Sequence, residues 1–436
     1  MKTKRDLVLA TGAQLLEKLL GYGILALFAH LYALADMGVF FFAVALAEIV
    51  GMVVQFGTNE NLVRSVAAKP EQALDSLGEV VGLRLVVTAI ALSALSAFFL
   101  MWKPDSAWIA IFAAGYMLAR NVYFAYAAFF VGVRRVTLRV VTLIASQVLM
   151  LASAGLAYAL GWSFEFVLGV FVGINVLLAV GSAGLTRVLF GRVPLHLHPT
   201  RMRALAYASA GLFATGVIGL LRFKADTLML GFIPVTNGPS TEVQVARYES
   251  AYKIFEASRF MVRPVILIYL PICAALYAQH KWRHLSQKLL RLYGASFVGG
   301  IVMAAVVFFL SPWIILTVYG DQYTEAIPVL QVLMLTVPLM YAGFCGQFMA
   351  NAMHLEKKVI LVSLGCLFAN IVANVFVIPR FGALGAAWTT LGTEALAMAG
   401  VGVLVMRRLA QGRRQDALAG QTSNEPGGEP AAVGAS

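Results

Sequence analysis

The sequence has few charged residues and lacks the motifs of nucleotide-driven enzymes. Lys, Arg, Asp and Glu make up only 12% of the 436 residues, against roughly 25% in an ordinary soluble domain. Together with 60% apolar residues, this composition excludes a disordered chain, a collagen-like chain and a small disulfide scaffold. No Walker A sequence is present, and no other chemistry motif points to catalysis. We therefore do not expect an enzyme.

Cysteine is also scarce, and the cysteines present predict no chemistry. Cys273, Cys345 and Cys366 each fall within an apolar stretch, and they have neither metal-ligand spacing nor the pattern of a disulfide framework. His196 and His198 lie among prolines in a basic segment, a context that predicts solvated side chains rather than a metal site. The sequence thus predicts no metal and no cofactor.

Long apolar stretches fill the chain instead. A transmembrane helix needs about 20 mainly apolar residues, and twelve stretches of this kind are present. The sequence therefore predicts an all-α integral membrane protein. The predicted spans cover residues 7–33, 37–63, 77–102, 106–132, 136–161, 163–189, 203–231, 246–278, 288–311, 324–352, 357–378 and 382–407.

Basic residues are distributed unevenly over the segments between these spans. Residues within about four positions of a span end are counted with the adjoining segment. Of the 33 Lys and Arg residues, 22 then belong to the alternating segments that include the N-terminus, 3 belong to the opposite set, and 8 lie deeper within spans. The positive-inside rule places the basic set in the cytoplasm, and an even number of spans places both termini there. Membrane topology, rather than nucleic-acid binding, thus explains the net charge of +12.

A basic cytoplasmic linker over 190–202 divides the spans into six and six. We expect an N-lobe over 1–189, a C-lobe over 203–410 and a disordered tail over 411–436, which is rich in Gly, Pro and Glu. A weak repeat supports the division, because Gly-x-Phe-x-x-Ala opens the second span and Ala-x-Tyr-x-x-Ala opens the eighth. Two six-helix lobes around a central cavity are a transporter architecture.

Ionisable residues occur within several spans, although each costs at least about 2.5–3.5 kcal/mol at mid-membrane. On the eighth span, at about 100° per residue, five of them fall within one arc of roughly 120°. These are Glu249, Lys253, Glu256, Arg259 and Arg263. Such a stripe cannot face lipid, so it predicts a wet cavity or a second polar surface. Pro264 and Pro271 are expected to kink the inner half of this helix.

The spans hold more cations than acids at comparable depth, which favours an anionic ligand such as a phosphate group. We expect the following cations to line the cavity and bind this ligand: Lys18, Arg120, Arg222, Lys253, Arg259 and Arg263. The alternative is structural ion pairing, for example of Arg222 with Asp226. Glu256 has the same alternative, with Arg259 or Lys253 as its partner.

Two further cations and a set of carboxyl groups remain to be assigned. Arg84 and Lys224 either line the cavity or extend to lipid head groups. Carboxyl groups at membrane depth are candidates for coupling transport to a proton or sodium gradient. These are Glu17, Glu48, Asp226, Glu256 and Glu394. A salt bridge is the alternative for Glu17, Glu48 and Glu394, and the sequence leaves both readings open.

Four motifs occur in order at the ends of spans. Residues 226–231 read D-T-L-M-L-G, residues 248–253 read Y-E-S-A-Y-K, residues 319–330 contain G-D-Q-Y-T-E-A, and residues 370–387 contain N-x-x-x-N, then a proline and G-A-L-G-A-A. This series resembles the polysaccharide flippases of the multidrug/oligosaccharidyl-lipid/polysaccharide exporter superfamily. One departure is Ala246, where that family usually has glycine.

The resemblance implies a transporter that moves undecaprenyl-diphosphate-linked oligosaccharide across the bacterial cytoplasmic (inner) membrane. It further implies alternating access, a role in O-antigen, capsule or exopolysaccharide assembly, and a polysaccharide polymerase and co-polymerase as partners besides membrane lipids. The charge pattern agrees with this, because a diphosphate-linked glycan is the anionic amphiphile that a cationic cavity suits. Tyrosines near the cavity either stack on sugar rings or are structural.

Three other functions are weighed against this one. A multidrug/cation antiporter of the same superfamily requires a net acidic cavity, whereas cations dominate here. A lipid II flippase typically carries two further spans, and none is visible. A membrane glycan polymerase or ligase has a large external loop with catalytic residues, and the longest external loop expected here, residues 232–245, is too short.

Overall fold

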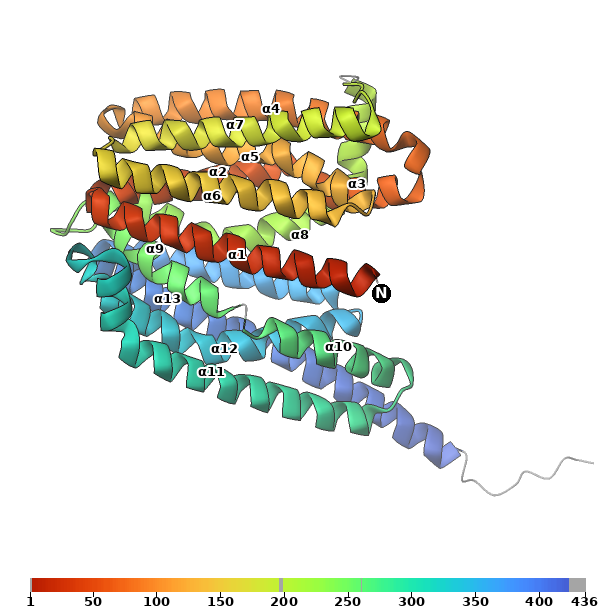
Figure 1. Cartoon of the computed structure of the whole chain (residues 1–436). Coiled ribbons are helices and arrows are strands. Elements are labelled where there is room, and N and C mark those ends of the chain that lie inside the picture. Colours follow the sequence, from red (N-terminus) through yellow and green to blue (C-terminus); the bar gives the residue numbers. More distant parts are fainter. Residues whose placement is uncertain (1, 196–198, 260, 423–436) are drawn as a thin grey trace, which may run out of the picture. The chain divides into compact units, whose positions relative to one another are not determined.

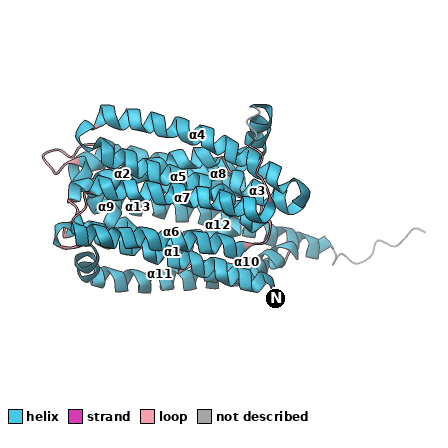
Figure 2. Cartoon of the chain, turned by 45° about the horizontal axis from the view of Figure 1, so that its top comes forward, coloured by secondary structure: helices cyan, strands magenta, loops and turns pink. Residues whose placement is uncertain are grey.

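Helices make up all the longer regular elements of the protein. The computed structural model describes residues 2–195, 199–259 and 261–422 (Figure 1). Over these ranges it contains helices and no strand (Figure 2). Eight helices in the described part are long and apolar enough to cross a membrane by length and composition. The predicted all-α membrane fold is therefore confirmed.

Each of the twelve predicted spans lies on a described helix or pair of helices. The first six spans are α1 (Lys2–Leu31), α2 (Leu34–Gln55) with α3 (Thr58–Ala68), α4 (Ala73–Trp102), α5 (Ala107–Gly132), α6 (Val136–Leu160) and α7 (Phe164–Phe190). The others are α8 (Pro199–Phe232), α9 (Thr241–Ser258) with α10 (Arg263–Ala278), α11 (Trp282–Tyr319), α12 (Ala326–Ala352) and the two halves of α13 (Glu356–Thr422). Short 3-10 turns are η1 (Pro70–Gln72), η2 (Pro104–Ser106) and η3 (Asp321–Tyr323).

The long helix α13 contains a sharp break at Gly382. This residue has a φ of 54°, a left-handed conformation that glycine adopts at little cost. Just beyond it, the backbone N–H of Ala383 donates to the side-chain oxygen of Gln244 at 2.9 Å, and a Cβ on residue 382 would overlap that same side chain. The break therefore needs glycine twice, once for the backbone angle and once for space.

The predicted eighth span is interrupted rather than merely kinked. Helix α9 ends at Ser258 and α10 begins at Arg263, with Pro264 at its second position. Proline cannot donate to the carbonyl four residues before it, so a continuous helix is disfavoured here. The prediction of one charged stripe on a continuous helix is therefore wrong beyond Glu256, because Arg259 lies in the interruption and Arg263 begins a second helix. Tyr341 donates to the carbonyl of Ser258 at 2.6 Å, which satisfies a group that the interruption leaves without a helical partner.

Arg84 is fully buried on α4, so the expectation that it extends to head groups is wrong. Its guanidinium donates to the hydroxyl of Thr58 at 2.8 Å, to the side-chain oxygen of Asn59 at 2.7 Å and to the carbonyl of Asn121 at 2.8 Å. Thr58 and Asn59 directly follow the break between α2 and α3, where the residue before α3 has a φ of 66°. Arg84 thus fastens this break to α4 and α5, because a buried guanidinium needs hydrogen-bond acceptors.

The C-terminal helix is longer than expected. Helix α13 continues through Gln411 to Thr422, so the first part of the predicted disordered tail is helical. Ala, Leu, Arg and Gln dominate this stretch, and all are strong helix formers. Residues 423–436, together with His196 and His198, lie outside the described residues.

The contacts divide the chain into two compact units. The first comprises Met1–Ile254, Phe308–Leu333 and Leu367–Thr390, and the second comprises Phe255–Val307, Met334–Cys366 and Leu391–Ser436. In the first unit, α5 packs against α2, α4 and α7, and α1 packs against α6. Figures 1 and 2 show these helices running alongside one another. The predicted lobe boundaries remain a prediction.

Each unit has its own apolar core. In the first unit, buried side chains of α3, α4 and α5 form one cluster, which includes Leu77, Phe129 and Phe130. In the second unit, the buried cluster includes Trp282 on α11 and Met353, which follows α12. Burial of such apolar side chains contributes about 1.5–3 kcal/mol each when the alternative is water.

Substituting Gly382 by Ala should lower the stability of the purified protein in detergent. A left-handed residue with a Cβ costs about 1–2 kcal/mol, and here the Cβ also overlaps Gln244. The matched control is Gly392→Ala on the same helix, where a Cβ meets nothing within 4 Å, and it should be neutral or stabilising by up to about 1 kcal/mol. Equal unfolding temperatures for the two variants would contradict this account of the break.

Candidate functional site: buried polar clusters of the first unit

The side chain of Asp226 lies at the centre of a buried polar cluster. One carboxylate oxygen accepts from the amides of Asn370 at 2.9 Å and Asn374 at 2.6 Å. The other accepts from the hydroxyls of Tyr248 at 2.7 Å and Thr390 at 2.6 Å. We call these five residues the Asp226 cluster. Helices α8, α9 and both halves of α13 contribute to it, so the break at Gly382 brings the two halves of α13 to one carboxylate.

All four partners of Asp226 are uncharged, and no lysine or arginine of the described chain forms an ion pair with it. The expected alternative pairing of Arg222 with Asp226 is therefore wrong, although the two residues have the i, i+4 spacing that permits it. Asp226 is 3% exposed. Four hydrogen bonds stabilise the negative charge of a carboxylate without neutralising it.

The Asp226 cluster also contains an acceptor without a hydrogen-bond partner, in Asn374. The side-chain oxygen of Asn374 is buried and has no hydrogen-bond partner among the described residues, while its amide group donates to both Asp226 and Asn370. A buried polar atom without a partner costs about 1–3 kcal/mol. Carboxylate and amide oxygens are ligands that a hard cation prefers, and this cluster contains both.

A second group of charges connects α2, α8 and α9. The ammonium of Lys224 lies 3.0 Å from the carboxylate of Glu48 and 3.7 Å from that of Glu249. Lys253, one helical turn after Glu249, lies 3.6 Å from the same carboxylate. Lys224 therefore lies between two carboxylates and does not extend to head groups as the alternative held. Thr227 also donates to Glu249.

A third group is the ion pair between Arg120 on α5 and Glu17 on α1. The guanidinium also lies over the ring of Phe124, with 5.4 Å between its central carbon and the ring centroid, which adds a cation–π attraction. The two alternatives for Glu17 and Glu48 were a coupling carboxyl and a salt bridge. The structure shows a salt bridge for each, to Arg120 and to Lys224 respectively. Arg120 and Lys253 lie in the spans as expected, but each already has a carboxylate partner.

The other predicted site residues are distributed over both units. Lys18 has an exposed side chain on α1, and Arg222 is half-buried on α8. In the second unit, Glu256 and Glu394 are half-buried. Arg259 lies in the interruption after α9, with its guanidinium carbon 5.6 Å from the ring centroid of Phe344. The side chain of Arg263 lies outside the description, although its backbone begins α10.

Sequence reasoning identified Asp226 but missed its partners as site residues. Asn370 and Asn374 were visible only as a motif, and their i, i+4 spacing places both amides on one face of a helix. Tyrosines near the cavity, Tyr248 among them, were expected to be structural or to stack on a sugar. Tyr248 is fully buried and donates to Asp226, as the structural alternative allows. Thr390 gave no signal, because nothing in a sequence shows that it faces α8.

Comparisons with known proteins identify a matching family and solved structures with a similar fold. The family described as "Polysaccharide biosynthesis protein" matches residues 4–277. The lipid II flippase MurJ in an inward closed conformation aligns with a TM-score of 0.69 and 14% identity, over 93% of this chain and 90% of that chain. No curated protein matches by sequence.

Two other solved structures have a similar fold. An inward-facing multidrug resistance MATE family transporter of the MOP superfamily aligns with a TM-score of 0.60 and 16% identity, over 95% of this chain and 96% of that chain. A MOP superfamily transporter from Pyrococcus furiosus aligns with a TM-score of 0.59 and 16% identity, over 94% of this chain and 95% of that chain. These likenesses show that the chain has the fold of the MOP transporters.

Substituting Glu249 by Gln should destabilise the protein by about 3 kcal/mol, because Lys224 and Lys253 would lose a buried carboxylate. The matched control is Glu242→Gln, which breaks the pair with Lys103 at the C-terminal end of α4. That pair is partly solvated, and such pairs contribute about 0–1 kcal/mol. Chemical unfolding in detergent measures both effects. A cost for Glu242→Gln as large as that for Glu249→Gln would contradict the structural role of the buried network.

Proposed function

The chain belongs to the polysaccharide biosynthesis protein family, and we propose that it is a flippase for undecaprenyl-diphosphate-linked oligosaccharide. The observation that carries the proposal is the family match over residues 4–277 on a chain with the MOP transporter fold. We place it in the bacterial inner membrane with both termini in the cytoplasm, from the distribution of basic residues. It would work by alternating access for surface polysaccharide assembly, beside a polymerase and co-polymerase.

The charges within the spans support an anionic substrate. A diphosphate presents several oxygens to guanidinium and ammonium groups, which bind it with charge-assisted hydrogen bonds. We propose that these contacts come from the six predicted cations: Lys18, Arg120, Arg222, Lys253, Arg259 and Arg263. Where a cation already has a carboxylate partner, as Arg120 has in Glu17, the diphosphate would compete with that carboxylate. Such a pair keeps the cation charge-balanced while no substrate is bound.

The pair of Arg120 and Glu17 allows binding and structure to be tested separately. We expect Arg120→Gln to lower transport of glycan lipid in proteoliposomes by at least about tenfold, since a hydrogen bond to a charged group contributes about 1.5–3 kcal/mol. The double variant Glu17→Gln/Arg120→Gln removes both charges and should recover stability, because no unpaired charge remains. Its transport should stay low, since the cation is still absent.

Two outcomes would contradict the proposal. If the double variant transports glycan lipid at the wild-type rate, the pair is structural and Arg120 does not contact the diphosphate. If proteoliposomes exchange a lipophilic cationic dye against an ion gradient but do not move glycan lipid, the protein is a multidrug antiporter instead. Glu17→Gln alone is the matched control, because it leaves the cation in place.

We also propose that Asp226 is the coupling carboxyl. Unlike Glu17 and Glu48, it is surrounded by uncharged donors that do not cancel its charge, and a sodium ion or a proton would replace one or more of these donors. The unsatisfied oxygen of Asn374 beside it supports a cation at this place. Because the cluster joins α8, α9 and both halves of α13, an ion bound there would favour one arrangement of these helices over another.

Asp226→Asn should leave the protein folded and remove the dependence of transport on the gradient that drives the wild type. Rates of glycan-lipid transport are measured with a sodium gradient and with a pH gradient, imposed separately. Glu17→Gln is the contrasting variant, which should lower the unfolding temperature and keep the gradient dependence. If neither gradient changes the wild-type rate, or if Asp226→Asn keeps the wild-type response, Asp226 is not a coupling site.

A further inference from the structure

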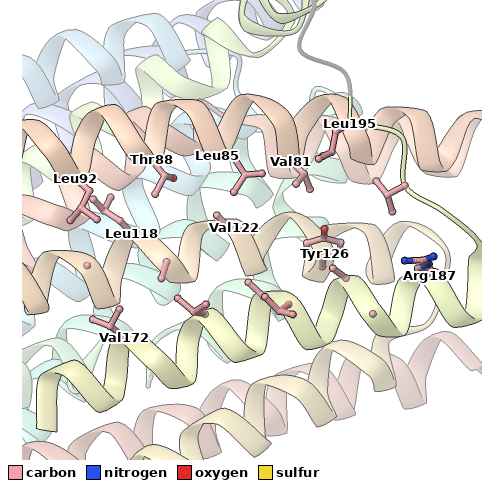
Figure 3. A pocket seen from close by; sticks show the side chains of 18 of the residues that line it. Val81, Leu85, Thr88, Leu92, Leu118, Val122, Tyr126, Val172, Arg187 and Leu195 are labelled. Atoms are coloured by element: carbon pink, nitrogen blue, oxygen red, sulfur yellow. The ribbon is translucent and has the colours of Figure 1, made fainter. Parts of the chain in front are cut away.

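The first unit has an apolar groove of about 700 Å³ on α4, α5 and α7. Figure 3 shows Leu92 and Val172 toward one end of this groove, and Arg187 and Leu195 at the other. Between the two ends the lining is almost entirely aliphatic. Within a bilayer such a surface meets lipid chains, but here the surface is hollowed between helices rather than convex.

The basic end of the groove is closed by the chain that follows α7. Residues 191–195 cross to α4, where the carbonyl of Pro194 packs so closely on Gly78 that any Cβ there would overlap it. This crossing places Arg192 and Leu195 in the lining, together with Arg187 from the last turn of α7. Two arginines therefore stand at one end of a groove that is otherwise apolar.

The second unit has a groove of the same kind, of about 750 Å³, on α11 and the second half of α13. It too is lined by aliphatic side chains, from Met398 to Leu409 on α13, and it has Arg413 at one end. In chain order, α7 is the last span of the first six and the second half of α13 is the last of the second six. The two halves of the chain thus carry the same feature on corresponding helices.

The two grooves also have the same length along these helices. Val172 and Arg187 are 15 residues apart on α7, and Met398 and Arg413 are 15 residues apart on α13, which corresponds to about 22 Å at 1.5 Å per residue. Half of a bilayer, head groups included, is about 20–22 Å thick. The length of each groove therefore matches the distance from the head groups to the bilayer midplane, and its arginines lie at the helix ends that the distribution of basic residues predicts to be cytoplasmic.

We propose that each groove binds an anionic phospholipid of the cytoplasmic leaflet, with an acyl chain along the aliphatic lining and the phosphate at the arginines. The guanidinium group suits a phosphate bidentately, and the length matches one leaflet. An undecaprenyl chain is several times longer than a fatty acyl chain and exceeds this length. A flippase that handles one substrate at a time also has no need of two equivalent tail sites, whereas phospholipids surround it on all sides.

Counting retained lipids tests the proposal. The full-length protein is purified in detergent with added phosphatidylglycerol or phosphatidylcholine and examined by native mass spectrometry. We expect two retained phosphatidylglycerol molecules in the wild type, and one each in Arg187→Gln/Arg192→Gln and in Arg413→Gln. Affinity at each altered groove should fall at least tenfold. The matched control is Arg134→Gln/Arg135→Gln, two exposed arginines outside both grooves, which should retain two.

Filling the grooves gives an independent test. A Cβ on Gly184 or Gly402, which line the two grooves, meets nothing within 4 Å, and the same holds for Gly181 and Gly392, which line neither. Gly184→Trp and Gly402→Trp should each lose one lipid, and Gly181→Trp and Gly392→Trp should lose none. Equal unfolding temperatures in phosphatidylcholine establish that the variants are folded.

The proposal is overturned if the arginine variants still retain two lipids, or if phosphatidylcholine is retained as well as phosphatidylglycerol. It is also overturned if undecaprenyl phosphate displaces phosphatidylglycerol at equal concentration, because the grooves would then be substrate sites. None of these measurements depends on transport, so they test the lipid sites independently of the proposed flippase activity.

Discussion

Hydrocarbon offers no hydrogen-bond partner to a polar group, and this constraint accounts for the irregular features of the described spans. Where a helix is interrupted, a side chain from another helix satisfies the freed backbone group. Gln244 accepts from the N–H after the break at Gly382, and Tyr341 donates to the carbonyl at the end of α9. At the break between α2 and α3, the hydroxyl of Thr58 donates to the carbonyl of Gln55, and Arg84 donates to that hydroxyl. Each break is therefore stabilised by a specific hydrogen bond from another helix.

The same constraint divides the buried charges into two kinds. Glu249 is held between two lysines, and Arg120 is held by Glu17, so these charges are balanced within the protein and their cost in the membrane is reduced. Asp226 is different, because hydrogen bonds from four neutral groups hold its charge in place without cancelling it. A balanced pair can exchange one partner for a substrate group, whereas an unbalanced carboxylate attracts a cation. These are the two properties that a coupled transporter of an anionic lipid requires.

How much of this was predictable depends on the range of the interaction. Hydropathy and loop charge act along the chain, so the spans and the all-α fold were read correctly from the sequence. The interruption at Ser258 was half visible, since Pro264 predicted a kink but not which backbone group would need a new partner. Pairing across helices was not predictable, because Asp226 lies one turn from Arg222 and yet turns toward Tyr248 and the asparagines of α13. Which face of a helix meets which neighbour is set by packing of the whole unit, and no local pattern records it.

Helix α7 shows how one span serves both an interior and a lipid-facing surface. Its buried face carries Asn175 and Thr186, and both donate to carbonyls of α7 itself, at 2.9 and 2.8 Å. Because the side chains of Asn175 and Thr186 are satisfied within the helix, these two residues need no charged partner from another span. Its remaining face is free to be purely aliphatic, as the groove lining from Val172 to Gly184 is. The buried ion pairs of the first unit are instead formed by α1, α2, α5, α8 and α9, where opposite charges lie next to one another.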